Sequence, residues 1–173
     1  AVVNTELVTS VELQQRLEEL LGQGTDERAR RERPRVSPSA TGPYSEPFGM
    51  LDLTEPLPPV QADQVQLEQV LSNLVKNGID AMSAISGERV LVIRTRVGAD
   101  GGVEIAVIDH GEGLAEAVRG DPFAPFATTK PDGVGLGLAI CRTIVENHSG
   151  RLWVESSTAQ GTTFCFSLPS AAA

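Results

Sequence analysis

The chain has 173 residues, with 14 basic and 23 acidic side chains, a formal net charge of −9 and only 4% aromatic residues. This length suits one domain that buries its own hydrophobic core. An acidic chain lacks the diffuse positive field of a non-specific nucleic-acid binder and is repelled by anionic membrane surfaces, so we expect no nucleic-acid partner and no membrane contact by this domain. A nucleotide is not excluded, because helix ends, local cations and a metal ion can hold a small polyphosphate.

The N-terminal quarter of the chain changes composition sharply. Apolar residues at helical spacing predict a helix over residues 5–21, which Gly22 and Gly24 end. Residues 22–47 are rich in charge, Pro, Gly and Ser. This composition predicts a long exposed loop or a partly disordered segment.

From residue 48 onward the pattern alternates between strands and helices. Apolar stripes at helical spacing mark two helices, and alternating or continuous apolar runs mark the strands. The expected elements are, in chain order, a strand at 48–54, a turn at 57–60, a helix from Asp63 to Ile85, strands at 89–97 and 103–109 joined as a hairpin, an irregular segment at 110–134, a helix from Gly135 to His148, and strands at 151–157 and 162–168.

This order predicts an α+β fold. We expect a two-layer α/β sandwich, in which a mixed, mostly antiparallel sheet is covered by helices on one face. The two cysteines, Cys141 and Cys165, lie in apolar surroundings and are expected to be buried free thiols rather than a disulfide or a zinc site. Without a signal-peptide pattern or a long apolar run, a cytoplasmic location fits best, and a membrane anchor elsewhere in a longer protein stays open.

The long predicted helix carries an unusual polar group. Asn73, Asn77 and Asp80 fall within an arc of about 60° beside the apolar stripe, given about 100° of turn per residue. Asparagine is a mediocre helix former, so the pair either satisfies a neighbouring loop or faces a cavity. In the second case the amide oxygens suit a hard cation such as Mg²⁺.

Two glycine-containing segments are the other candidates for chemistry. Asp109 at a strand end is followed by Gly111 and Gly113, which either form a turn capped by the Asp or let the backbone approach a ligand. Further on, the run Thr128-Thr129-Lys130 precedes glycines at 133, 135 and 137, where an amphipathic helix begins. A glycine-rich helix N-terminus beside a lysine suits an anion, whereas a flexible loop explains the glycines alone.

Together these segments resemble the catalytic, ATP-binding domain of sensor histidine kinases, within the gyrase/Hsp90-like ATP-binding superfamily, over about residues 1–169. The matching motifs are Leu67-Glu-Gln-Val-Leu-Ser-Asn-Leu-Val-Lys-Asn77-Gly-Ile-Asp-Ala81 (N box), Asp109-His-Gly-Glu-Gly113 (G1 box), Pro122-Phe-Ala-Pro-Phe126-Ala-Thr-Thr-Lys130 (F box), Gly133-Val-Gly-Leu-Gly137-Leu (G2 box) and Gly161-Thr162-Thr-Phe164.

The resemblance implies a Bergerat-type fold with ATP and Mg²⁺ as cofactors, a flexible ATP lid at 112–134 and a short tail at 170–173. Asp109 would accept a hydrogen bond from the adenine amine, Asn77 would bind Mg²⁺, and Asn77 with Lys130 would be the catalytic pair. Phe123 and Phe126 would anchor the lid. The full set of cofactor-binding residues implied in this way is Asn73, Asn77, Asp80, Asp109, Gly111, Gly113, Thr128, Thr129, Lys130, Gly133, Gly135, Leu136, Gly137, Leu138 and Thr162.

Departures from the family pattern refine the implied activity. Gly78 stands where Ala is usual and costs about 1 kcal/mol of helix propensity. Relatives that hydrolyse ATP generally carry a Glu where this chain has Asn73, which favours phosphoryl transfer to a protein over hydrolysis. Neither His110 nor His148 lies in an acceptor motif, so both are expected to be structural or surface residues.

The acceptor histidine is therefore expected on a dimerisation domain outside this chain, with a response regulator downstream, and the isolated domain is not expected to autophosphorylate. Two alternatives remain open at this point. One is a nucleotide-regulated interaction module of the anti-sigma or partner-switching type. The other is a degenerate pseudokinase, although no diagnostic residue is lost.

Overall fold

The computed structural model describes residues 6–9, 12, 15, 19, 48–54, 56–86, 89–130 and 133–171. Its helices and strands alternate much as the sequence predicts. In chain order they are β1 Glu6–Val8, β2 Phe48–Leu53, β3 Val60–Ala62, α2 Gln64–Ala81, β4 Val90–Val97, β5 Val103–Ile108, α3 Glu116–Arg119, α4 Gly137–Asn147, β6 Arg151–Thr158 and β7 Gly161–Leu168.

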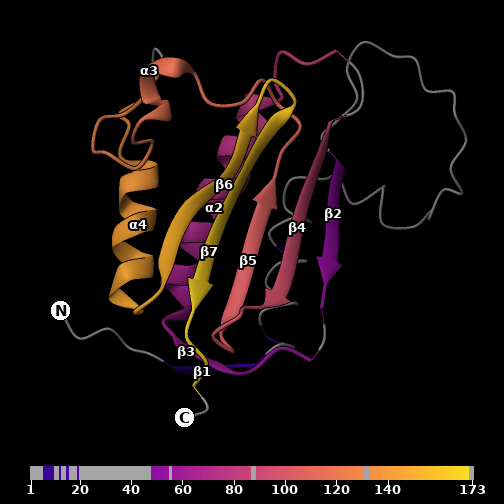
Figure 1. The fold of residues 1–173 in the computed structure, drawn as a ribbon, viewed down its shortest axis with the longest axis vertical. Helices are drawn as coiled ribbons and strands as arrows, with labels where there is room; N and C mark the ends of the chain where they lie inside the picture. Colours follow the sequence, from indigo (N-terminus) through magenta and orange to yellow (C-terminus); the bar gives the residue numbers. More distant parts are fainter. Residues whose placement is uncertain are drawn as a thin grey trace, which may run out of the picture.

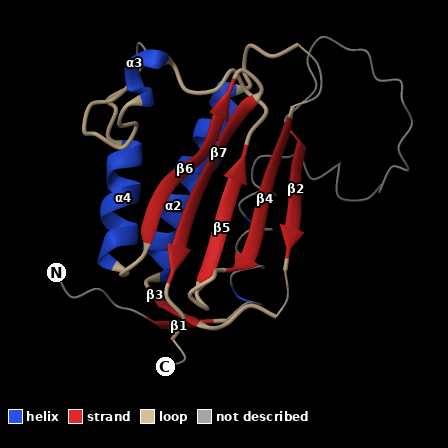
Figure 2. Ribbon diagram, viewed as in Figure 1, coloured by secondary structure: helices blue, strands red, loops and turns tan. Residues whose placement is uncertain are grey.

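The main sheet has five strands in the order β2-β4-β5-β7-β6. The β2–β4 pair is parallel, and the other three pairs are antiparallel. Helices α2 and α4 lie against one face of this sheet, and the short antiparallel pair β1–β3 closes one end (Figures 1 and 2). The α+β fold class and the mostly antiparallel mixed sheet predicted from the sequence are confirmed.

Helix α2 forms because apolar residues recur at helical spacing, and those that are buried face the sheet and α4, whereas Val65 is exposed. Asp63 caps its first turn by accepting a hydrogen bond from the Gln66 N–H at 3.0 Å. The helix ends at Ala81, four residues before the predicted end at Ile85. At that point Ser83 N–H turns to Asp80 O and Ile85 N–H to Met82 O, so the chain tightens into a turn that buries Met82 completely.

The helix predicted over residues 5–21 is wrong at its start. Residues 6–8 form strand β1, which pairs with β3 in register Leu7↔Gln61 and buries Val8. Further along, Glu12, Gln15 and Glu19 are helical, as predicted. The turn predicted at 57–60 likewise gives way to strand β3 from Val60, because Val60 and Ala62 alternate into the core on either side of exposed Gln61. The loop predicted at 22–47 lies outside the described residues.

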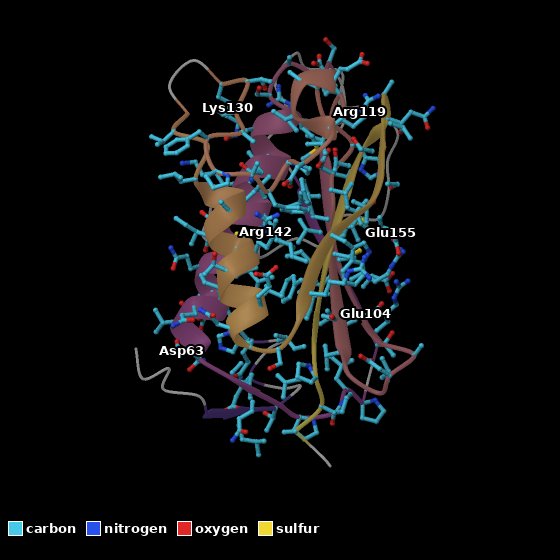
Figure 3. The ribbon with its side chains drawn as sticks, turned by 60° about the vertical axis from the view of Figure 1, so that its left-hand side comes forward. Asp63, Glu104, Arg119, Lys130, Arg142 and Glu155 are labelled. Carbon is cyan, nitrogen blue, oxygen red and sulfur yellow. The ribbon has the colours of Figure 1, made fainter. Side chains whose placement is uncertain are left out.

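The sheet face away from α2 and α4 carries charged pairs between strands. Arg94 lies 2.7 Å from Asp52, and Arg96 lies 2.6 Å from Glu104 and 3.0 Å from Glu155. Figure 3 shows Glu104 and Glu155 on this side. Because exposed ion pairs contribute about 0–1 kcal/mol each, these pairs add little to the stability of the sheet.

Both cysteines are buried free thiols, as predicted. Burial raises the pKa of Cys141 to about 11 and that of Cys165 to about 12, so both thiols stay protonated at neutral pH. Within the described ranges, no helix has the length and apolar character that crossing a membrane requires.

His148, at the end of α4, joins α4 to the start of α2. Its Nδ1–H donates to Ile144 O at 2.8 Å, and its Nε2 accepts from Asp63 N–H at 2.9 Å. Because a carbonyl only accepts and an amide N–H only donates, these partners fix one neutral tautomer. The side chain is 5% exposed, so His148 is structural, as the sequence predicts.

We expect His148→Leu to lower the free energy of unfolding by about 1–3 kcal/mol, because the N–H of Asp63 loses its partner. Urea denaturation followed by circular dichroism measures this loss. His110→Leu is the matched control, because His110 is exposed and water can replace its hydrogen bond to Val90 O. Equal losses in the two variants would contradict a bridging role for His148.

Candidate functional site

The predicted site residues gather at one end of the molecule. The end of β5 and the C-terminal end of α2 lie there, and the segment from residue 110 to the start of α4 runs between them (Figure 1). This arrangement follows from topology, because β5 points toward the end of the molecule at which α2 finishes and α4 begins.

Asp109 is fixed by the strands around it. It follows β5 directly, and its N–H donates to Thr162 O on the neighbouring strand β7 at 2.9 Å. Its carboxylate Oδ1 accepts two backbone N–H groups, from Gly111 at 2.9 Å and from Thr162 at 3.2 Å. With an exposed fraction of 4%, the side chain is held in one orientation by backbone on both sides.

Burial has an electrostatic cost at Asp109. Desolvation raises the pKa of this carboxyl above its ordinary value, and the hydrogen bonds from Gly111 and Thr162, followed by the nearby His110, oppose that rise in part. Both hydrogen bonds go to Oδ1. No other described residue donates to the carboxylate, so Oδ2 keeps its capacity to accept a hydrogen bond from a ligand.

Gly78 brings α2 unusually close to Asp109. A Cβ atom added at Gly78 would lie 2.5 Å from Leu91 Cδ1 and 3.2 Å from Asp109 Cβ. An alanine here would require the end of the Leu91 side chain to move and the Asp109 methylene group to shift by a few tenths of an ångström. The glycine therefore lets α2 and the end of β5 meet without these adjustments.

Two other glycines have positive φ angles that their surroundings require. Gly113, at φ 78°, passes so close to Thr158 O that any Cβ would overlap it. Gly135, at φ 71°, packs against the backbone of Phe126 and accepts a hydrogen bond from Phe126 N–H at 2.9 Å. Both ends of the segment are thus held by backbone contacts that exclude other residue types.

The polar side of α2 meets Lys130. The Lys130 Nζ lies 2.7 Å from Asp80 Oδ2 and 3.3 Å from Asn77 Oδ1. Figure 3 shows Lys130 on the segment that passes the C-terminal end of α2. The structure therefore brings Asn77, Asp80 and Lys130 together across about fifty residues of chain.

Asn73 lies one turn earlier, between α2 and α4. Its Cγ is 3.9 Å from where a Cβ on Gly137, the first residue of α4, would stand. Helix α4 begins at Gly137 without a side-chain cap on its first turn. Its first N–H groups are therefore free to bind an anion beside Asn73, and the helix dipole favours negative charge there.

The two phenylalanines of the irregular segment behave differently. Phe123 is 8% exposed and packs edge-on against Phe164 with ring centroids 6.1 Å apart, so it anchors the segment as predicted. Phe126 is 71% exposed with φ 66°, so the prediction that it anchors the segment is wrong. Its N–H donates to Gly135 O, and in this turn the ring points outward.

The oxygen donors on α2 suit Mg²⁺ only when substrate phosphates complete its coordination. Among the described residues no three His, Cys, Asp or Glu side chains come together as a metal site. Asn77 and Asp80 supply an amide and a carboxylate oxygen, and both already face one cation, the Lys130 ammonium. Since Mg²⁺ typically binds one or two protein oxygens plus substrate phosphates, this donor set suits it.

The other predicted residues have smaller parts in the geometry. Thr128 Oγ1 accepts from Lys130 N–H at 3.1 Å, and Leu138 packs against the core. Thr162 contacts Asp109 through its backbone rather than its hydroxyl. Thr129 is exposed, and Gly133 and Leu136 are partly buried on the path into α4.

One contact was missed at the sequence level. The hydroxyl of Ser157 accepts from Leu114 N–H at 2.8 Å and fixes the start of the segment to β6. Nothing in the strand pattern of residues 151–157 indicates this role, because it depends on where β6 pairs with β7.

Comparison with known proteins agrees with this geometry. The family described as histidine kinase-, DNA gyrase B- and HSP90-like ATPase matches residues 62–172. The chain is 44% identical over 121 residues to the sensor protein TdiS of Thauera aromatica, covering 69% of this chain and 22% of that protein. It is 46% identical over 112 residues to the sensor protein FixL of Bradyrhizobium diazoefficiens, covering 65% and 22%. The chain thus spans about a fifth of these relatives.

Solved structures share the fold. The catalytic domain of the histidine kinase ThkA, in a nucleotide-free form, superposes with a TM-score of 0.70 at 27% identity and covers 96% of this chain and 95% of its own. Full-length ShkA in complex with AMPPNP gives a TM-score of 0.72 at 26% identity, covering 100% and 33%. The chain therefore belongs to the histidine kinase-, DNA gyrase B- and HSP90-like ATPase family, as a catalytic domain of the kind found in sensor histidine kinases.

Proposed function

We propose that this domain binds ATP with Mg²⁺ and donates the γ-phosphoryl group to a histidine on a separate dimerisation domain. The observation that carries the proposal is the buried Asp109 carboxylate, which is fixed through Oδ1 and keeps Oδ2 able to accept. The AMPPNP complex of the structural neighbour ShkA supports a nucleotide as the ligand.

Asp109 would recognise the adenine amine. An exocyclic amine donates hydrogen bonds, and a desolvated carboxylate oxygen is a strong acceptor for it. A buried carboxylate with no such partner would only destabilise the fold.

The polyphosphate would lie between the start of α4 and the polar side of α2. Free N–H groups at Gly137 and the ammonium of Lys130 are the donors that anionic oxygens need. Asn77 would hold Mg²⁺ together with the phosphates, and the metal would neutralise charge that develops during transfer. These groups position the γ-phosphoryl group, and none of them attacks it.

Transfer to a protein is favoured over hydrolysis by Asn73. A neutral amide cannot take a proton from water, so Asn73 cannot act as the general base of a hydrolysis. The nucleophile would then come from the dimerisation domain of a sensor kinase, and a response regulator would receive the phosphoryl group from it. The sensor-protein names of the relatives support this setting.

We expect Asp109→Asn to weaken binding of AMPPNP by about 10- to 100-fold, the worth of a hydrogen bond to a charged group. The amide oxygen would keep both backbone N–H groups, so the amide nitrogen would face the adenine amine, donor against donor. Isothermal titration calorimetry measures the change. Asp52→Asn, on the opposite sheet face, is the control, and equal affinity of Asp109→Asn and wild type would refute the adenine assignment.

The same substitution should stabilise the fold. Because burial raises the pKa of Asp109, the wild-type protein loses stability as pH rises through that pKa, and the loss is absent below the ordinary value of 3.8. Asp109→Asn is therefore expected to resist urea better than wild type at neutral pH, and the difference should shrink as the pH is lowered toward 3.8.

The phosphotransfer step has its own test. We expect the domain with [γ-³²P]ATP and Mg²⁺ to label a separately supplied histidine-containing dimerisation domain, and to release much less free phosphate. Replacement of the acceptor histidine by Gln should abolish labelling. Nucleotide binding with no transfer to a cognate dimerisation domain would favour a nucleotide-regulated interaction module instead.

A further inference from the structure

The proposed function assigns Mg²⁺ to Asn77 and gives no step to the neighbouring Asp80 carboxylate, yet Asp80 makes the shortest polar contact on this side of α2. Its Oδ2 lies 2.7 Å from Lys130 Nζ, against 3.3 Å between the same nitrogen and Asn77 Oδ1. Asp80 follows Asn77 by three residues, so the two side chains lie on one side of the helix. The ammonium is therefore shared between a carboxylate and the amide oxygen assigned to Mg²⁺.

We propose that Asp80 is a positioning residue that stores the Lys130 ammonium against Asn77, so that Mg²⁺–nucleotide binding and release of Lys130 from Asn77 are one coupled event. The proposal rests on the proposed function for its ligand. It adds a role for Asp80 and a link between the metal position and the segment that carries Lys130.

Competition at one oxygen produces the coupling. A Mg²⁺ ion binds its ligands at about 2.0–2.1 Å, which leaves no room for an ammonium on the same side of Asn77 Oδ1. Two positive charges would also repel each other at that distance. Lys130 must then leave Asn77, while Asp80 keeps it within reach of the phosphates that arrive with the metal.

The contact is weak enough to break. The side chains of Lys130 and Asp80 are 48% and 40% exposed. An exposed ion pair of this kind shifts an equilibrium by at most about fivefold. The pair therefore biases the position of Lys130 without locking it, so Lys130 can leave Asn77 and reach the phosphates.

If Lys130 moves, the turn that contains it, which Thr128 and Gly133 hold by hydrogen bonds, would move with it. Its N–H donates to Thr128 Oγ1 at 3.1 Å, and its carbonyl accepts from Gly133 N–H at 3.1 Å. Gly135, two residues later, is bonded to Phe126 just before α4 begins. These hydrogen bonds hold the chain on both sides of Gly133 to Gly135, only two residues before α4 begins at Gly137.

The first test measures, without nucleotide, how firmly Lys130 is held against Asp80 and Asn77. Hydrogen–deuterium exchange of peptides covering residues 124–136 should be about two- to fivefold faster in Asp80→Asn and in Lys130→Met than in wild type. The Asp80→Glu variant should restore slow exchange, and Lys76→Met, elsewhere on α2, should have no effect. Unchanged exchange in Asp80→Asn would overturn the proposal. Circular dichroism verifies that each variant is folded.

The second test uses calorimetry with AMPPNP, with and without Mg²⁺. If Asp80 acts through Lys130, Asp80→Asn and Lys130→Met weaken binding and the double variant is no weaker than Lys130→Met alone. Additive losses, or a loss for Asp80→Asn that appears only with Mg²⁺, would make Asp80 a separate metal ligand and overturn the proposal. Tighter binding by Asp80→Asn would show that its charge only repels phosphate, which also overturns it.

The two tests separate this proposal from the proposed function. If wild type fails to bind AMPPNP under any condition, the proposed function fails, and so does the coupling to a metal–nucleotide ligand. The exchange experiment still reports whether Asp80 holds Lys130. If wild type binds AMPPNP normally but the exchange and the double variant show no link, only the role of Asp80 fails.

Discussion

Everything at the site depends on how closely α2 packs against the sheet. Its buried apolar residues each contribute about 1.5–3 kcal/mol, and they leave one side of the helix for polar groups. Gly78 eases this close approach, because a side chain there would require Leu91 and Asp109 to shift. That single helix consequently meets Asp109 at one residue, Lys130 at two others, and the start of α4 through Asn73.

Stability and binding oppose each other at Asp109. The strands bury a carboxylate whose desolvation raises its pKa, and two backbone N–H groups offset only part of this cost. Both donors go to one oxygen, so the fold fixes the side chain without satisfying it. A neutral amide would suit the folded state better, which is the relation expected where a residue serves a ligand rather than the core.

The sequence predicts most of the fold because its patterns are local. The apolar stripe of α2 and the alternation in β4 to β7 gave elements within a few residues of their observed bounds. Failures occur where tertiary contacts decide. Residues 6–8 read as helix from their spacing but pair with β3, and Phe126 is turned outward by its bond to Gly135. For the site, spacing indicated Asn77 and Asp80, whereas only the fold brings Lys130 to them.

The net charge of −9 makes the contacts around Lys130 important for phosphate binding. An acidic domain attracts no polyanion at long range, so any affinity for phosphates must come from groups at close quarters. A lysine free in solvent would lose side-chain entropy each time it was recruited. Held beside Asp80 and Asn77, Lys130 is already near the start of α4, and its charge is masked by a carboxylate until a second cation competes for Asn77. If this proposal holds, the acidic residue Asp80 would serve a phosphate site by keeping its cation in place.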